Sequence, residues 1–232
     1  MAAQADPSIH WSKKPLTLRL ISAAVLIPIV VVAVYAGGIA WTLLVALFSI
    51  VMIVEWCKIA ARRSGAVSWY ALGIVYVFVP CAALIWLRND LAVGLQQIFW
   101  IVALVIAADT GAYIAGRSIG GPKLAPRVSP NKTWAGLGGA VVSAAIVGAI
   151  TALVMDRPTV WPLAAVSAGL AIIEQAGDLA ESAFKRHFGV KDASHIIPGH
   201  GGALDRVDGL IAVAAAVAGI NLLMGSSVLT WL

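Results

Sequence analysis

Charged residues are scarce in this chain: they make up 12% of its 232 residues, whereas 61% are hydrophobic. A soluble domain is normally about a quarter charged. A water-soluble chain of this size could not bury so much apolar surface in one core. The scarcity of charge therefore excludes an ordinary soluble domain and indicates a protein that lies in a membrane.

Cysteine is scarcer still, and several common site patterns are missing. Cys57 and Cys81 are the only cysteines, and both lie inside apolar runs. No disulfide framework and no CxxC site is implied. The histidines lack the HExxH pattern of zinc enzymes. The string GRSIGGPK at 116–123 has no hydroxyl residue after its lysine, which excludes a Walker phosphate loop.

Long apolar runs are what the sequence has in abundance. A membrane-spanning helix needs about 20 mostly apolar residues, and seven segments qualify. Only short connectors separate them, so we expect a cytoplasmic tail, residues 1–15, and a single transmembrane catalytic domain, residues 16–232. The predicted fold class is an all-α polytopic membrane protein, whose last span is interrupted by Gly-Ser-Ser at 225–227. The seven predicted spans are 16–36, 38–60, 69–87, 92–116, 134–155, 159–184 and 207–230.

The lysines and arginines predict an orientation, because cytoplasmic loops carry an excess of them. Of the sixteen, only Arg88 and Arg157 fall on one side of the seven spans. We therefore expect the N-terminus in the cytoplasm and the C-terminus outside, in a bacterial inner (plasma) membrane with the active site facing the cytoplasm. Since the cations lie between apolar runs, they suit anionic headgroups or substrates better than nucleic acid.

The richest polar stretch follows the sixth predicted span. Asp178, Glu181, Ser182 and Lys185 recur at i, i+3, i+4 and i+7, so they share one face of a helix. Two carboxylates and a hydroxyl form an oxygen site that suits Mg²⁺, and the lysine could bind an anion. The alternative is a frayed helix end with casual surface ion pairs.

A second acidic pair opens the seventh span. Asp205 and Asp208 share a face, although acidic residues in a first turn also complement the helix dipole. The glycine-rich string at 198–202 lets backbone N–H groups approach phosphate oxygens. Carboxylates for a divalent metal, cations for phosphate and a bendable backbone together predict metal-assisted phosphoryl or nucleotidyl transfer.

Three carboxylates are embedded in apolar runs, where a charge is costly and usually functional. Asp109 is the one we expect at a substrate, with a packing ion pair as the alternative. Glu55 and Glu174 are each expected either to pair with a neighbour or to relay protons. His200, which stands between glycines, is the histidine expected to touch a substrate.

These strings resemble the phosphatidate cytidylyltransferase (CDP-diacylglycerol synthase) family. Its C-terminal pattern, Ser-x-x-Lys-Arg, then Lys-Asp, then Pro-Gly-His-Gly-Gly-x-x-Asp-Arg-x-Asp, is matched from Ser182 to Asp208. The strings DTGAYIAGR and SPNKTW, further back, are similar to that family too, so the resemblance covers roughly 109–208. Ala135 and Gly209 stand where the family usually has Glu and Ser.

The resemblance implies an enzyme that makes CDP-diacylglycerol and pyrophosphate from CTP and phosphatidate, with Mg²⁺ as cofactor. The resemblance leaves open whether a second, monovalent cation binds and whether the protein forms a homodimer. The expected metal ligands are Asp178, Glu181, Asp205 and Asp208. The expected catalytic residues are Asp178, Lys185, Asp205, Arg206 and Asp208, and the expected substrate-binding residues are Asp109, Ser129, Lys132, Thr133, Ser182, Arg186, Lys191, His200, Gly201 and Gly202.

Two alternatives remain beside this reaction. A CTP-dependent lipid kinase is the nearest, because its substrates have the same character. An ion-coupled transporter would use Glu55, Asp109 and Glu174 as a path for protons or ions. It is less favoured because the polar residues cluster towards one face and no inverted repeat is visible.

Overall fold

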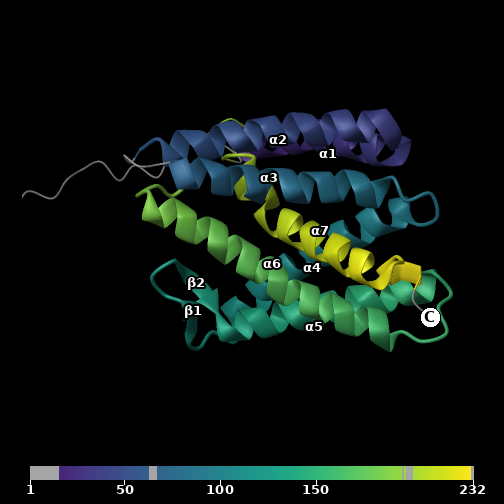
Figure 1. Cartoon of the computed structure of the whole chain (residues 1–232). Coiled ribbons are helices and arrows are strands. Elements are labelled where there is room, and N and C mark those ends of the chain that lie inside the picture. The colour runs from purple at the N-terminus through teal and green to yellow at the C-terminus, as the bar shows by residue number, and fades with distance from the viewer. Residues whose placement is uncertain (1–15, 63–66, 195, 197–200, 231–232) are drawn as a thin grey trace, which may run out of the picture.

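The residues that the structure describes form seven long helices (Figure 1). The computed structural model describes residues 16–62, 67–194, 196 and 201–230, so the predicted tail, residues 1–15, lies outside the described residues. The elements in chain order are α1 (Leu16–Ala36), α2 (Gly38–Ala60), α3 (Val67–Arg88), α4 (Gly94–Ser118), β1 (Lys123–Ala125), β2 (Ser129–Thr133), α5 (Trp134–Val154), α6 (Trp161–His187), α7 (Leu204–Met224) and the 3₁₀ turn η1 (Val228–Thr230).

The helices confirm the predicted helical membrane fold. Each predicted span coincides with one helix, and α2 to α7 are all long and apolar enough to cross a membrane. The last helix ends at Met224, directly before the predicted interruption. Large apolar side chains such as Leu43, Leu47 and Ile50 on α2 are exposed. Outward-facing apolar surface of this kind suits lipid rather than water.

A short antiparallel hairpin between α4 and α5 supplies the two strands of the described residues. Prolines at 122, 126 and 130 prevent a helix there, because proline has no N–H to donate. Lys123 pairs with Thr133 across the two strands. The Thr133 side chain then accepts from Gly136 N (3.0 Å), which caps the first turn of α5. The hairpin therefore runs directly into the fifth span.

The helices form two groups with α7 between them. In Figure 1, α1, α2 and α3 lie above and α4, α5 and α6 below, and α7 contacts members of both groups. Within the lower group, α4 and α5 approach closely at Gly111 and Gly139. A Cβ added to Gly111 would lie 2.5 Å from the carbonyl oxygen of Gly139. A Cβ added to Gly139 would lie 2.4 Å from the carbonyl oxygen of Gly111. Small residues thus permit the tight helix packing typical of membrane bundles.

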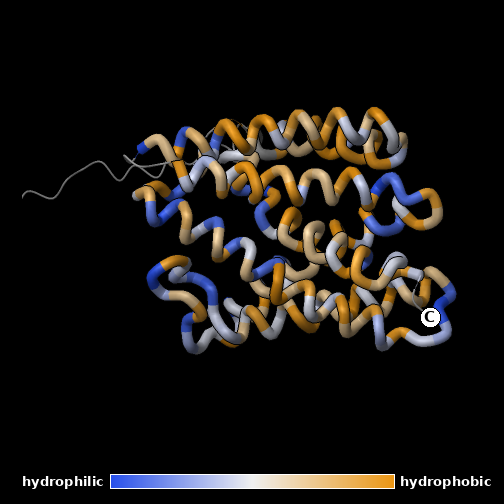
Figure 2. Tube along the Cα trace, in the orientation of Figure 1, coloured by the Kyte–Doolittle hydropathy of each residue, from blue (hydrophilic) through white to orange (hydrophobic). Residues whose placement is uncertain are grey.

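Polar residues gather at the two ends of the bundle (Figure 2). One end carries the start of α1, the hairpin and the end of α6, and the other carries the turns after α1, α3 and α5 together with η1. At the hairpin end the hydrophilic colour continues inward along α6 and into the first turn of α7.

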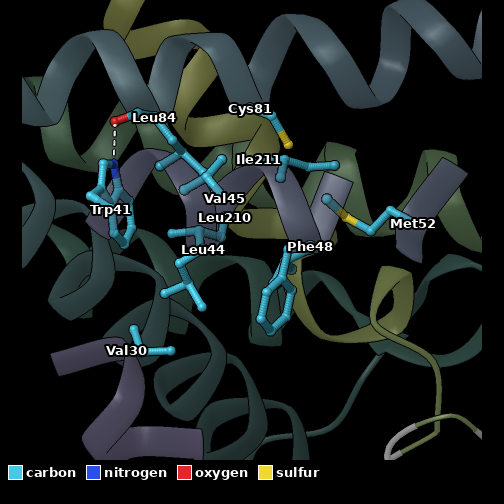
Figure 3. Close-up of a pocket in the computed structure, with 11 residues that line it drawn as sticks. Val30, Trp41, Leu44, Val45, Phe48, Met52, Cys81, Leu84, Leu210 and Ile211 are labelled. Atoms are coloured by element: carbon cyan, nitrogen blue, oxygen red, sulfur yellow. Dashed lines mark hydrogen bonds between the residues drawn. The ribbon is translucent and has the colours of Figure 1, made fainter. Parts of the chain in front are cut away.

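An apolar cavity of about 140 Å³ lies between the upper helix group and α7 (Figure 3). Its only dashed contact in Figure 3 is the bond from Trp41 Nε1 to the carbonyl oxygen of Leu84 (3.0 Å). This cavity offers no charged group for chemistry. It is lined by Val30, Trp41, Leu44, Val45, Phe48, Met52, Cys81, Leu84, Val207, Leu210 and Ile211.

Candidate active site

A second, polar cavity of about 600 Å³ opens at the hairpin end, between β2, α6 and α7. The cavity brings the hairpin, which precedes α5, next to the end of α6 and the start of α7. Most of the residues expected to bind substrate or metal line it. The full lining is Asp109, Val128, Ser129, Pro130, Asn131, Glu174, Asp178, Ser182, Lys185, Arg186, Lys191, Asp192, Asp205, Arg206 and Asp208.

The predicted polar face of α6 forms one wall of this cavity. Asp178, Ser182 and Lys185 line it, and the Ser182 hydroxyl donates to Asp178 Oδ1 (3.3 Å). Glu181 belongs to the same polar face but is only 1% exposed and does not line the cavity. Its carboxylate instead lies 2.6 Å from the Lys185 ammonium. The i, i+3, i+4, i+7 spacing therefore supplies the cavity with the Asp178 carboxylate, the Ser182 hydroxyl and a lysine that the buried Glu181 contacts.

Lys185 joins the two acidic sets that the sequence places apart. Its Nζ lies 2.6 Å from Glu181 Oε2 on α6 and 2.6 Å from Asp205 Oδ1 on α7. Asp205 also accepts from the backbone N–H groups of Ala193 (3.0 Å) and Gly202 (3.0 Å). Both of its oxygens therefore have donors already, and Asp205 links Ala193 to Gly202, the last residue of the glycine-rich string.

A chain of polar contacts runs from β2 towards the middle of the bundle. Lys132 Nζ lies 2.6 Å from Asp178 Oδ2 and donates to Gln175 Oε1 (2.8 Å). Gln175 Nε2 in turn donates to Glu174 Oε2 (2.8 Å). Sequence reasoning missed Gln175, although its spacing of three residues from Asp178 places it on the same polar face of α6. Lys132 is thus fixed by α6 at the edge of the cavity.

The four expected metal ligands do not form one cluster. Glu181 and Asp205 converge on Lys185, whereas Asp178 and Asp208 line the cavity from α6 and α7 and lie close enough to interact electrostatically. Among the described residues, no three His, Cys, Asp or Glu side chains are grouped tightly enough to hold a metal by themselves. Two carboxylates nevertheless fit Mg²⁺, which usually combines one or two of them with substrate phosphates and water.

The remaining expected residues divide between the cavity and the scaffold. Arg186 lines the cavity and donates from Nε to the carbonyl of Val128 (3.5 Å), which ties the end of α6 to the hairpin. Thr133 is 4% exposed and caps α5 instead of lining the cavity. His200 lies outside the described residues. The lining also includes Asn131 and Asp192, which stand within the strings that resemble the family but were not singled out.

The three embedded carboxylates have different surroundings. Asp109 and Glu174 line the inner part of the cavity and lie next to each other. Glu55 is fully buried and accepts hydrogen bonds from Ser194 Oγ, Ala203 N and Leu204 N. Of the two roles expected for Glu55, the structure favours pairing.

Comparisons with known proteins place this chain in a family. A model described as the cytidylyltransferase family matches residues 62–223. A phosphatidate cytidylyltransferase from Brucella suis is 35% identical over 245 residues, which include 86% of this chain and 91% of that protein. Those from Rickettsia typhi (34% over 218 residues, 90% and 93%) and Bacillus subtilis (36% over 172 residues, 73% and 64%) are similar as well. The resemblance in the motif strings is thereby confirmed, and the chain belongs to the cytidylyltransferase family.

Proposed function

We propose that this protein transfers the cytidylyl group of CTP to phosphatidate, forming CDP-diacylglycerol and pyrophosphate. The observation that carries the proposal is the polar cavity, where carboxylates of α6 and α7 face the cationic side chains of Lys185, Arg186, Lys191 and Arg206 at one end of a membrane bundle. A lipid phosphate and a water-soluble nucleotide can meet at such a place. The names of the relatives support the same reaction.

The chemistry asks little covalent work of the protein. A phosphate oxygen of phosphatidate attacks the α-phosphorus of CTP, the bond from that phosphorus to the bridging oxygen breaks, and pyrophosphate leaves. The attacking phosphate is already ionised at neutral pH, so no strong general base is needed. The protein has to orient two anions and offset their repulsion. Lys185 and Arg186 on α6 and Arg206 on α7 are placed to do this from facing walls.

Asp178 and Asp208 are the residues that would hold Mg²⁺ in this proposal. Mg²⁺ bound there would supply positive charge to the phosphates. Asp205 and Glu181, which were expected as ligands, hold Lys185 at the cavity wall instead. Lys132, kept in place by Asp178 and Gln175, is within reach of a phosphate that enters between the hairpin and α6. A second, monovalent cation would need oxygens beyond these two carboxylates.

The proposal also includes a cytoplasmic position for the cavity in a bacterial inner membrane. All described lysines and arginines except Arg88 and Arg157 lie towards the hairpin end, and cytoplasmic loops carry such an excess. CTP would therefore enter from the cytoplasm. Reporter fusions at the two termini test the orientation, and signals from the same side would contradict it. Cross-linking in native membranes tests the expected homodimer.

Product analysis is the experiment that tests the reaction. Purified protein in lipid nanodiscs is incubated with CTP, Mg²⁺ and either phosphatidate or diacylglycerol. We expect CDP-diacylglycerol and pyrophosphate in equal amounts, from phosphatidate only. Phosphatidate and CDP formed from diacylglycerol would instead identify a CTP-dependent lipid kinase. Omitting Mg²⁺ in the presence of a chelator tests the cofactor separately from the substrates.

A further inference from the structure

The glycine-rich segment between α6 and α7 is tied at both ends to the same two carboxylates. At its entrance, Ala193 N donates to Asp205 and the Ser194 hydroxyl donates to Glu55. At its exit, Gly202 N donates to Asp205, and Ala203 N and Leu204 N donate to Glu55. Asp205 belongs to the cavity wall, but Glu55 comes from α2 and no part of the mechanism uses it.

Glu55 takes the place of a local cap for α7. The first N–H groups of a helix have no partner within the helix. Ala203 and Leu204, which are 2% and 0% exposed, cannot use water, and the N-cap residue Ala203 makes no side-chain capping bond. Glu55 Oε1 accepts from Ala203 N (3.0 Å) and Oε2 from Leu204 N (2.9 Å). A carboxylate at this position also complements the helix dipole.

The surroundings of Glu55 are shaped for this contact. Its side chain is 0% exposed, and among the described residues its partners are one hydroxyl and two backbone amides, with no lysine or arginine in an ion pair. A Cβ added to Gly202 would lie 3.0 Å from each Glu55 carboxylate oxygen and 2.9 Å from the Ala193 Cβ. Gly202 was expected to bind substrate. The structure gives a reason for a glycine at this position, because the missing side chain leaves room for Glu55.

We propose that Glu55 is a positioning residue, which fixes the start of α7 and thereby the placement of Asp205, Arg206 and Asp208 in the cavity. This inference rests on the proposed function for its kinetic consequence, but not for the structural contact. Asp205 and Asp208 lie in the first turns of α7, directly after the two amides that Glu55 holds. An error in the start of α7 is therefore passed on to both carboxylates.

Glu55→Gln tests the role, with Met52→Ala as the matched control. Glutamine keeps the shape but turns an N–H donor towards groups that are themselves donors. Met52 lies one turn away on α2, is 2% exposed and lines the apolar cavity, so its truncation weakens α2 without touching the loop. Partners that orient the carboxylates of a site typically matter by about 10–100-fold. We expect kcat of Glu55→Gln to fall by about that factor with KM for phosphatidate unchanged, and kcat of Met52→Ala to stay at the wild-type value.

Hydrogen–deuterium exchange provides a readout that needs no substrate. Exchange of the amides of Ala203 and Leu204 should accelerate in Glu55→Gln and not in Met52→Ala, at a temperature at which both are folded. Unchanged exchange there, or a kcat no lower than that of the control, would overturn the proposal. If Glu55→Gln does not fold, Gly202→Ala displaces the same carboxylate and should accelerate the same two amides. A wild-type protein without turnover would contradict the proposed function, and the exchange data would still decide the role of Glu55.

Discussion

The two cavities of this protein lie on different faces of α7 and differ in almost every respect. The polar cavity receives Asp205 and Asp208 from this helix, whereas the apolar cavity receives Val207, Leu210 and Ile211. At about 100° per residue, Asp205 and Asp208 point on average to the other side of the helix from Val207, Leu210 and Ile211. One helix therefore separates the polar cavity from a cavity that is lined by apolar side chains.

The contrast teaches where charge is retained inside a membrane protein. Two lysines at the polar cavity are held by carboxylates: Lys132 by Asp178, and Lys185 by Glu181 and Asp205. A charge in a membrane segment is expensive unless it is paired or serves a function. In these pairs the carboxylates balance the positive charge of the lysines, which stay at the cavity wall. The apolar cavity has no such groups, so we expect changes on that face of α7 to alter stability but not chemistry.

Asp208→Asn should have the largest effect. The amide keeps the size of the side chain but removes one of the two cavity carboxylates that we propose as Mg²⁺ ligands. Losing a single electrostatic group of this kind typically lowers kcat by about 10²–10³-fold. CTP-dependent pyrophosphate release over a Mg²⁺ titration measures the change, and the melting temperature checks folding. Near-normal turnover at low Mg²⁺ would contradict the assignment of Asp208 as a ligand.

Lys132→Ala should have the next largest effect. The change removes the ammonium that contacts Asp178 and Gln175, and with it a cation for phosphate. Hydrogen bonds to charged groups contribute about 1.5–3 kcal/mol, which corresponds to a loss of about 10–100-fold in kcat/KM for CTP. Lys123→Ala is the matched control, because this lysine lies on the partner strand and is exposed. Equal losses in the two variants would indicate a general effect of charge at this end.

The helices were predictable from the sequence, and the pairing within the site was not. Runs of about 20 apolar residues locate the spans because the bilayer requires them. The 3.6-residue period also places Asp178, Ser182 and Lys185 on one wall. Sequence spacing cannot show, however, that Lys185 contacts α7 or that Lys132 contacts Gln175, because such contacts depend on how separate helices pack. For the same reason the sequence did not show that Glu181 and Asp205, which are expected as metal ligands, both pair with Lys185.

Gly209→Ala should have a moderate effect, because this glycine allows Glu174 to lie against α7. A Cβ at position 209 would lie 2.7 Å from Glu174 Oε1 and 2.9 Å from its Cγ. Glu174 would have to move, and Gln175 and Lys132 are linked to it by hydrogen bonds. Overpacking typically costs about 1–3 kcal/mol of stability. The cost should shrink in a Glu174→Ala background, so a double-mutant cycle of unfolding free energies measures it. Equal costs in the two backgrounds would show that the contact is unimportant.

Ile211→Ala should have the smallest effect on turnover, although it is expected to destabilise the protein. Ile211 is 1% exposed and lines the apolar cavity, whereas Asp208 lines the polar one. Truncating a buried isoleucine typically costs about 2–5 kcal/mol, more when the neighbours cannot close the gap, and here an existing cavity would be enlarged. Thermal unfolding in one detergent measures that loss, and kcat is compared at a temperature where both proteins are fully folded. We expect kcat and KM for CTP to remain at their wild-type values, since no group in the polar cavity changes. A large loss of kcat in folded Ile211→Ala would mean that packing on this face also places the carboxylates, and the two faces of α7 would then not be independent.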